Sequence, residues 1–241
     1  MRDMDWRFWG MVVLGVGVAL GGALAGYGFA QGRVAERFVT VKGVSEREVQ
    51  ADLAVWPLQV IAADNDLEAA NAQLARGLDG VRQFMARQGL DTTQIALTGY
   101  YVEDAAANQY ATSVARNRFV IRQTLVLRST EPAKVLAASQ RVSELASAGV
   151  AISSAGGTEG PTFLFTRLND LKPEMIAEAT ARAREAAEQV ALDANSQLAG
   201  IRRANQGVFE ILARDQAPGI SQPGQLDKTV RVVSTIEYTL E

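Results

Sequence analysis

The stretch from Val39 to Val60, VTVKGVSEREVQADLAVWPLQV, begins with alternating side chains and then changes character. In its first part Glu46, Glu48 and Asp52 share one parity and aliphatic residues share the other, which is typical of a half-buried strand with one wet face. From Ala54 to Ile61 both parities are apolar. A strand that is apolar on both faces is expected to be buried on both faces. The stretch therefore predicts a sheet that is covered by a helix or by another subunit.

Three large side chains of the apolar part, Trp56, Leu58 and Val60, are candidates for an oligomer interface. Pro57 lacks a backbone N–H and therefore favours an edge strand. An edge strand with two apolar faces fits either burial under a helix of its own chain or contact with a neighbouring subunit. The sequence leaves both alternatives open.

The carboxylates raise the question of catalysis. Residues i and i+2 of a strand lie roughly 6.5–7 Å apart, near the separation of about 6.5–9.5 Å between the two carboxylates of inverting glycosidases. Every pair of acids at this spacing on any strand gives the same match, and a general acid also needs a raised pKa. Lys42 and Arg47 make the neighbourhood polar. We interpret Glu46, Glu48 and Asp52 as a solvated strand face, and a carboxylate-based hydrolase or ligand-binding protein is the alternative.

The composition narrows the chemistry that the chain can perform. Its 241 residues include no histidine and no cysteine. This excludes imidazole bases, Ser-His and Cys-His pairs, and the usual ligands of zinc. We identify no catalytic, cofactor-binding or metal-binding residue and expect a protein that is not an enzyme and has no cofactor. The net charge of −3, with acids and bases interspersed, argues against nucleic acid as a partner.

The segment from Phe8 to Ala30 contains no charged residue. As a helix it would be roughly 35 Å long, enough for a hydrocarbon core of about 30 Å. Trp9 and Tyr27 lie near its two ends, where aromatic anchors are common. A cleaved signal peptide is the competing interpretation, since Gly28 and Ala30 suit positions −3 and −1 of a cut. The apolar run exceeds the usual core of about 7–15 residues in such peptides, which favours a retained anchor.

Two GxxxG patterns occur in this segment, one formed by Gly17 and Gly21 and the other by Gly22 and Gly26. Such patterns allow close packing of membrane helices. Glycine is also frequent in membrane helices in general. Self-association through the anchor is therefore one interpretation of these glycines, and their general frequency in membrane helices is the other.

After residue 32, strands and helices alternate along the chain. Periodicity predicts helices over residues 66–90, 131–149 and from Asn169 or Asp170 to Leu198, and the last helix carries an alanine stripe that permits close packing. Strands are predicted over residues 38–62, 93–104, 116–129, 150–156, 161–168, 207–214 and 228–241. This order predicts an α+β fold, with a largely antiparallel sheet and three helices, preceded by one N-terminal transmembrane helix.

Three tyrosines, Tyr100, Tyr101 and Tyr110, surround the predicted loop after the second strand. Exposed aromatic side chains near a loop more often mark packing or a protein interface than a small-molecule site. We add these three residues to the candidate oligomer interface.

Four segments together resemble a known family: Val39–Val60, PTFLFTRLNDLKPEMIAEATARAREAAEQVA (161–191), RRANQGVFEI (202–211) and KTVRVVSTIEYTL (228–240). The chain from Phe38 to Glu241 resembles the SIMPL-domain family, and more closely its membrane-anchored bacterial branch. The resemblance implies an exported or envelope-anchored bacterial protein with an α+β fold. Some members assemble into large rings or cages, and some are linked to oxidative-stress defence. The resemblance implies no catalytic residues.

These observations predict a non-enzymatic, single-pass protein of the bacterial inner membrane. Residues 1–32 would form the anchor in the lipid bilayer, and residues 33–241 would form a periplasmic domain. Its main partner would be itself, in a homo-oligomeric ring or cage, and the resemblance implies a link to stress defence. The alternatives are a ligand-binding or carboxylate-based hydrolytic envelope protein, and a pore formed by the oligomer.

Overall fold

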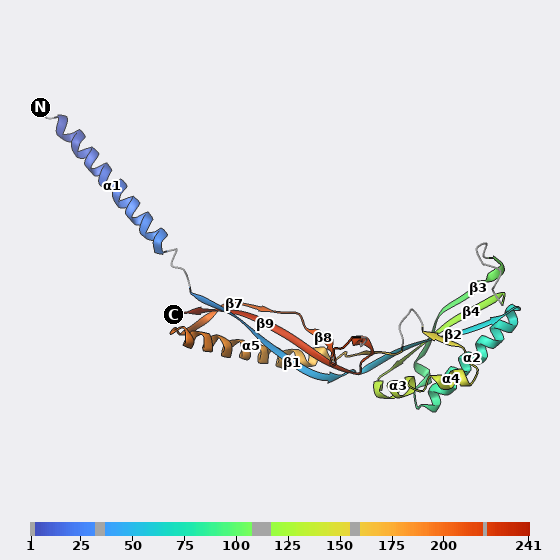
Figure 1. Ribbon diagram of the computed structural model, residues 1–241. Helices are drawn as coiled ribbons and strands as arrows, with labels where there is room; N and C mark the ends of the chain where they lie inside the picture. The colour runs from blue at the N-terminus through green and yellow to red at the C-terminus, as the bar shows by residue number, and fades with distance from the viewer. Residues whose placement is uncertain (1–2, 32–36, 108–116, 155–159, 219–220) are drawn as a thin grey trace. The chain divides into compact units, whose positions relative to one another are not determined.

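The Val39–Val60 stretch forms two strands in the computed structural model (Figure 1). Strand β1 spans Phe38–Gln50 and strand β2 spans Leu53–Asp64. The two strands belong to different sheets. Between them, the N–H of Ala51 donates to the carbonyl of Leu226 (2.9 Å) and the N–H of Asp52 donates to that of Leu164 (3.0 Å). The change of character seen in the sequence therefore marks a change of sheet, because the half-wet pattern belongs to β1 and the two-sided apolar pattern to β2.

The structure describes residues 3–31, 37–107, 117–154, 160–218 and 221–241. The chain divides into two compact units. The first consists of residues 1–41, 184–205 and 235–241, and the second of residues 42–183 and 206–234. Each unit is described by itself.

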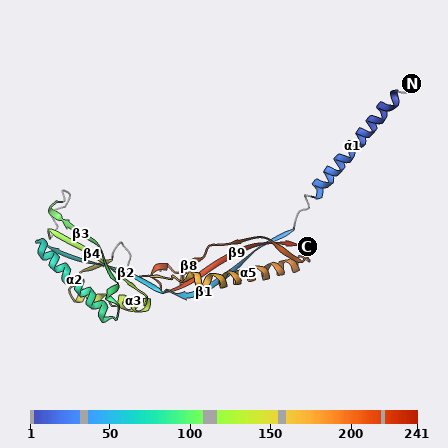
Figure 2. The ribbon, with the colours of Figure 1, turned by 180° about the vertical axis from the view of Figure 1, so that it is seen from behind.

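A five-stranded antiparallel sheet lies in the second unit. Its strand order is β3-β4-β2-β5, and β6 also pairs with β2. The further strands are β3 (Ile95–Asp104), β4 (Phe119–Ser129), β5 (Ile152–Ser154) and β6 (Thr162–Leu164). The helices of this part are α2 (Leu67–Arg87), α3 (Pro132–Ser139) and α4 (Ser143–Ser147), which lie on one side of the sheet (Figures 1 and 2).

Helix α2 packs closely on β2 because a glycine faces the strand. A Cβ atom at Gly77 would lie 2.8 Å from Cγ1 of Val60. Buried side chains of α2, including Leu74, Val81 and Phe84, form one core with buried residues of β2 and β4. At roughly 1.5–3 kcal/mol for each fully buried large apolar side chain, this cluster dominates the stability of the sheet.

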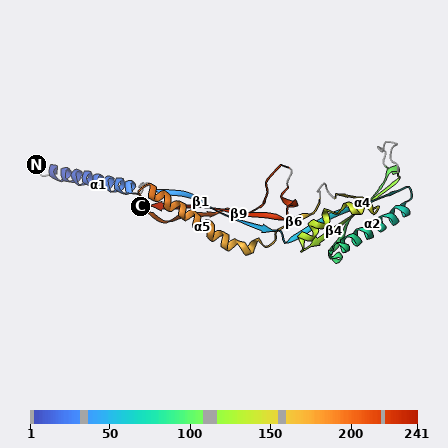
Figure 3. The ribbon, with the colours of Figure 1, turned by 60° about the horizontal axis from the view of Figure 1, so that its bottom comes forward.

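The other sheet has the order β1-β9-β7, and β8 pairs with β9. Its strands are β7 (Leu198–Gln206), β8 (Glu210–Ala213) and β9 (Asp227–Leu240). Helix α5 (Leu168–Asp193) lies alongside β1 and β9 (Figure 3). Short 3₁₀ turns occur at Thr92–Gln94, Ala105–Ala107 and Gln222–Gly224.

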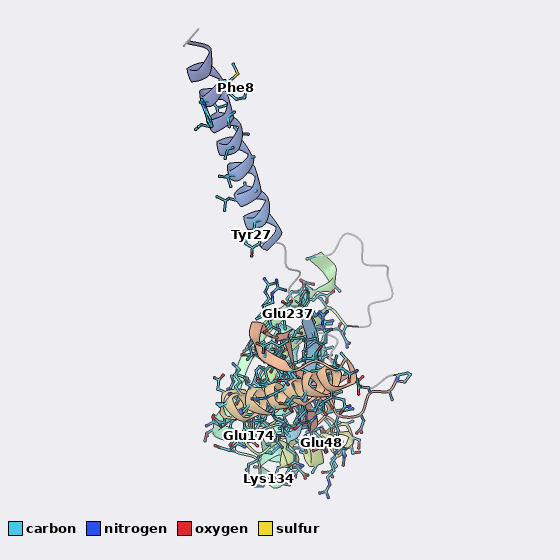
Figure 4. The ribbon with its side chains drawn as sticks, turned by 90° about the vertical axis from the view of Figure 1, so that its left-hand side faces the viewer. Phe8, Tyr27, Glu48, Lys134, Glu174 and Glu237 are labelled. Atoms are coloured by element: carbon cyan, nitrogen blue, oxygen red, sulfur yellow. The ribbon has the colours of Figure 1, made fainter. Side chains whose placement is uncertain are left out.

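Helix α1 spans Asp3–Gln31. Its segment Phe8–Tyr27 has a mean hydropathy of 2.0 and is long enough to cross a membrane, a property shared by N-terminal signal sequences. Figure 4 labels Phe8 and Tyr27 near the two ends of this helix. Apolar side chains on α1, such as Trp9, are exposed in the structure.

The predicted α+β class with antiparallel pairing and an N-terminal apolar helix is confirmed. The strands form two sheets, however, and the region predicted as one helix over residues 131–149 forms α3 and α4. The hydroxyl of Ser139 donates to the carbonyl of Leu136 (2.7 Å), at the point where α3 ends. Such a side-chain bond competes with continued helix.

The end of the last helix was also predicted wrongly. Helix α5 ends at Asp193, and residues 198–206 form strand β7. Asn195 adopts a left-handed conformation (φ 50°), and the N–H of Ser196 donates to the carbonyl of Ala191 (2.9 Å). Asparagine therefore ends the helix in the way that glycine often does.

Strand β2 is central in its sheet, so the expectation of an edge strand at Pro57 is wrong. On one side β2 pairs with β4 along its length, including Pro57 with Val126. On the other side the pairing with β6 ends at Val55, and the pairing with β5 begins at Leu58. Pro57 lies in the gap between these two short strands, where it interrupts no ladder.

Candidate functional site

The carboxylates of the opening stretch each have a different partner. Oε1 of Glu46 lies 3.3 Å from Nε of Arg231 on β9. Asp52 accepts hydrogen bonds from the N–H and the hydroxyl of Thr166, at 2.9 and 3.1 Å, and lies 3.5 Å from Nε of Arg167. The side chain of Asp52 therefore fixes the segment that follows β6.

Glu48 faces a separate cluster of charges around Arg214. Nη1 of Arg214 donates to Asp227 (2.7 Å) and Nη2 donates to Asp215 (3.1 Å). The hydrogen bond to Asp215 is the largest cause of the raised pKa of Arg214, and the charge of Glu48 adds a smaller effect. The carboxylates of Glu46, Glu48 and Asp52 are thus hydrogen-bonded or neutralised by nearby cations through several separate contacts.

A network of polar side chains joins β1 to α5. The hydroxyl of Ser45, which is buried, donates to Oε2 of Glu178 (2.8 Å). Arg182 donates to Oε1 of the same carboxylate (2.6 Å), and Arg47 lies 3.4 Å from Oε2. The Ser45 hydrogen bond, followed by Arg182 and Arg47, lowers the pKa of Glu178. The network holds the helix in register on the strand.

Trp56, Leu58 and Val60 are buried inside the chain, with 1%, 5% and 1% exposure. They belong to the core under α2. Of the two alternatives for this segment, burial under a helix is the one that the structure shows. These three side chains therefore offer no surface to a second copy, which corrects their place in the candidate interface.

The opposite face of β2 is mostly apolar. Val55, Pro57, Ile61 and Ala63 point there with Gln59, and all are half-buried. The register places Val126 of β4 beside Pro57 and Val120 beside Ala63, and it also places Arg128, Thr124 and Arg122 on this surface, which therefore mixes apolar and polar side chains. Among the described residues, no helix covers this surface, which we call the open face. The sequence contained a signal for the open face, because the residues of β2 are apolar at both parities.

Strand β3 forms an edge of the five-stranded sheet and is exposed along most of its length. Tyr100 and Tyr101 are 54% and 58% exposed, and Leu97 and Val102 beside them are also exposed. The hydroxyl of Tyr100 contacts Oδ1 of Asn71 on α2 (3.4 Å). Predicted residue Tyr110 lies outside the described residues. An exposed apolar edge strand is a site where another chain can pair.

One buried charge was not anticipated from the sequence. Lys228 on β9 is fully buried, and its Nζ donates to the carbonyl of Gln222 (2.7 Å). Burial lowers the pKa of Lys228. The sequence did not indicate a buried charge here, because the two indications for Lys228 conflict. Its parity in the strand places it on the core side, whereas its charge favours solvent.

The predicted anchor residues all lie on α1. No neighbouring atom comes within 4 Å of a Cβ built at Gly17, Gly21, Gly22 or Gly26. Within the described part of the chain, no group of three or more acidic side chains is placed to hold a metal ion.

Two antiparallel sheets, a set of covering helices and an N-terminal apolar helix define this α+β protein. The chain belongs to the SIMPL family, described as proteins of unknown function (DUF541), whose model matches residues 39–237. No curated protein matches the chain.

Several solved structures resemble parts of the chain weakly. The regulatory subunit of aspartate kinase from Thermus flavus is 14% identical, with 82% of this chain and 89% of that chain covered and a TM-score of 0.20. An uncharacterized conserved protein from Listeria innocua is 11% identical, with 78% and 91% covered and a TM-score of 0.20. A hydrolase from Listeria innocua is 12% identical, with 78% and 90% covered and a TM-score of 0.18. Likenesses of this size support no conclusion about the present chain.

Proposed function

We propose that this protein is a non-enzymatic, membrane-anchored component of the bacterial cell envelope that self-assembles into a homo-oligomeric ring or cage. Helix α1 holds each copy in the inner membrane, and the SIMPL domain lies in the periplasm. The domain acts as a building block of the assembly, which serves in stress defence. Membership of the SIMPL family and the apolar helix α1 support this proposal.

The open face of β2 and β4 is the observation that carries the proposal. A sheet in a soluble domain usually has one face on the core and one polar face. Here the second face presents Val55, Pro57 and Ile61 on the central strand, with Val126 beside Pro57 and two arginines, Arg128 and Arg122, beside the other two. Apolar side chains surrounded by polar ones, on a sheet face that no described helix covers, are typical of a protein interface.

Strand β3 supplies a second contact next to the open face. Its backbone edge is exposed, and Tyr100 and Tyr101 supply aromatic contact area. Aromatic residues are enriched in interfaces because they bury much area with few rotatable bonds. A copy that contacts the open face and another that pairs with the edge would give each subunit two different contacts, which is what a closed ring requires.

The test uses the full chain in mild detergent and a pair of matched variants. Ile61→Glu places a charge in the open face, and Ala75→Glu places the same charge at an exposed position of α2. Sedimentation velocity should show a large particle for the wild type and for Ala75→Glu, and a much smaller one for Ile61→Glu. Circular dichroism checks that the variants are folded. Equal particle size for both variants would remove the open face from the interface.

A second pair keeps the test independent of that single position. Tyr101→Ser removes an exposed ring from β3, and Thr93→Ala removes a hydroxyl at the surface before β3 begins. The first change should weaken the assembly and the second should leave it unchanged. If every variant in both pairs assembles as the wild type does, the proposed interface is wrong.

A further inference from the structure

A polar cavity lies on the sheet of the first unit. Its volume is about 410 Å³, and it is lined by Phe38, Arg202, Arg203 and Glu237. A second hollow, of about 480 Å³, shares Arg203 and Glu237 and is also lined by Ala204, Asn205 and Thr235. Strand β9, which carries Glu237, lies between β1 and β7. The cavity therefore combines residues from three adjacent strands.

The lining combines two cations, one anion and one aromatic ring. Cζ of Arg202 lies 4.6 Å from the centre of the Phe38 ring. Glu237 is half-buried, and neither it nor Arg203 has a hydrogen bond or ion pair with any residue that the structure describes. Figure 4 labels Glu237. A half-buried carboxylate beside an unpaired guanidinium is a favourable place for a ligand that carries both signs of charge.

The chemistry of these groups defines the ligand. A guanidinium binds two oxygens of a phosphate through its planar set of N–H donors. A carboxylate accepts hydrogen bonds from a primary ammonium group. An aromatic ring suits the apolar carbons that join such groups to a lipid. A phosphate and an ammonium separated by a short linker would match Arg203 and Glu237 together.

The covalent chain brings this cavity within reach of a bilayer. Phe38 follows Gln31, the last residue of α1, after residues 32–37. About seven steps of at most 3.6 Å give a reach of roughly 25 Å whatever the conformation of the connection. The headgroup layer extends roughly 5–8 Å beyond the hydrocarbon core. A membrane spanned by α1 therefore supplies headgroups at high local concentration next to the cavity.

We propose that the cavity binds the headgroup of a phospholipid that carries a phosphate and a primary ammonium, as phosphatidylethanolamine does. Arg202 and Arg203 contact the phosphate, Glu237 accepts from the ammonium, and the Phe38 ring packs on the adjoining carbons. This inference rests on the membrane anchor of the proposed function. It adds a specific lipid partner and a site that holds the first unit against the membrane surface.

The experiment uses the full chain reconstituted in vesicles. Because the chain has no cysteine, Ile201→Cys gives a single labelling site on β7, and Ala75→Cys gives a control site on α2. A fluorophore on each site is quenched by a small fraction of headgroup-labelled lipid. The vesicles contain phosphatidylcholine alone, or phosphatidylcholine mixed with phosphatidylethanolamine or with phosphatidylglycerol. The three compositions separate recognition of ammonium and phosphate together from attraction to negative charge.

The expected result is additional quenching at residue 201 in the phosphatidylethanolamine vesicles and no additional quenching at residue 75. Glu237→Gln and Arg203→Gln should abolish that additional quenching, whereas Glu185→Gln, an exposed change on α5, should retain it. Equal quenching at residue 201 in all three lipids, or more in phosphatidylglycerol than in phosphatidylethanolamine, would overturn the proposal. Extraction of the chain from vesicles by alkaline carbonate would contradict the anchor itself, and this proposal with it.

Discussion

Gly43 of β1 packs directly against the backbone of Ala179 on α5. A Cβ atom at residue 43 would overlap the carbonyl oxygen of Ala179 and would lie 2.6 Å from the backbone nitrogen of Ala183. The neighbouring atoms are backbone, so they cannot rotate away. The alanine stripe of α5 and the single glycine of β1 are therefore two halves of one close contact. This contact explains why small residues recur at a helical spacing in that part of the sequence.

Gly43→Ala should destabilise the protein because the strand and the helix must move apart. Overpacking of this kind typically costs about 1–3 kcal/mol. Gly200→Ala on β7 is the matched control, since a Cβ there meets nothing within 4 Å. Urea unfolding followed by circular dichroism measures both changes. Similar midpoints for Gly43→Ala and the wild type would show that the contact is looser than described.

The carboxylate of Glu178 should make stability depend on pH. Its pKa is lowered in the folded protein, first by the Ser45 hydroxyl and then by Arg182 and Arg47. A lowered carboxylate pKa means that its contribution is complete above the unfolded value near 4.5 and is lost as the pH falls through the folded value. The free energy of unfolding of the wild type should therefore exceed that of Glu178→Gln at pH 7, and the difference should shrink below about pH 4.5. A difference that stays constant from pH 7 to pH 3 would contradict the assigned network.

Lys228 should also make stability rise with pH, but in the alkaline range. Burial lowers its pKa below the ordinary value of 10.5, so the unfolded chain binds the proton more strongly. Stability then rises as the pH increases from the folded pKa towards the unfolded pKa. Compared with Lys228→Met, which keeps most of the apolar volume, the wild type should gain stability as the pH rises towards the unfolded value of 10.5. Parallel curves for the two proteins over this range would exclude a perturbed lysine.

Asp52 should prove to be a structural residue of the connection between the sheets. It accepts from both the N–H and the hydroxyl of Thr166. Hydrogen bonds to a charged group typically contribute about 1.5–3 kcal/mol, so Asp52→Ala should lower the free energy of unfolding by an amount of that order. Thr166→Val removes one of the two donors and should have a smaller effect. An unchanged unfolding midpoint for Asp52→Ala would show that these bonds do not hold the segment.

Several parts of the fold could be predicted because their sequence pattern reports burial directly. The two-sided apolar pattern of Ala54–Ile61 correctly indicated a strand, and burial under a helix was one of the two alternatives that it left open; the expected burial of both faces is found for one face only. The turn from β1 to β2 could not be predicted, because neither of its residues, Ala51 and Asp52, is a glycine or a proline. The backbone hydrogen bonds at this turn are made to residues that are distant in the sequence. Strand β7 was missed because its exposed sequence, which includes Arg202 and Arg203, has no apolar alternation.

For the candidate sites, too, some features could be predicted from the sequence and others could not. Trp56 and its neighbours were assigned to a candidate interface but lie in the core, because parity alone could not say which face of β2 the helices would cover. The cavity at Glu237 depends on strands that are remote in sequence, so no local motif could have indicated it. The two tyrosines of β3 are exposed in the structure, and their part in an interface stays a prediction.

The full chain should assemble with copies of itself. Light scattering of the purified full chain in a mild detergent, with the detergent contribution subtracted, measures its mass directly. We expect a defined multiple of the 25.8 kDa subunit mass that persists on dilution. A mass of one subunit at every protein concentration, in a sample that is folded by circular dichroism, would contradict it.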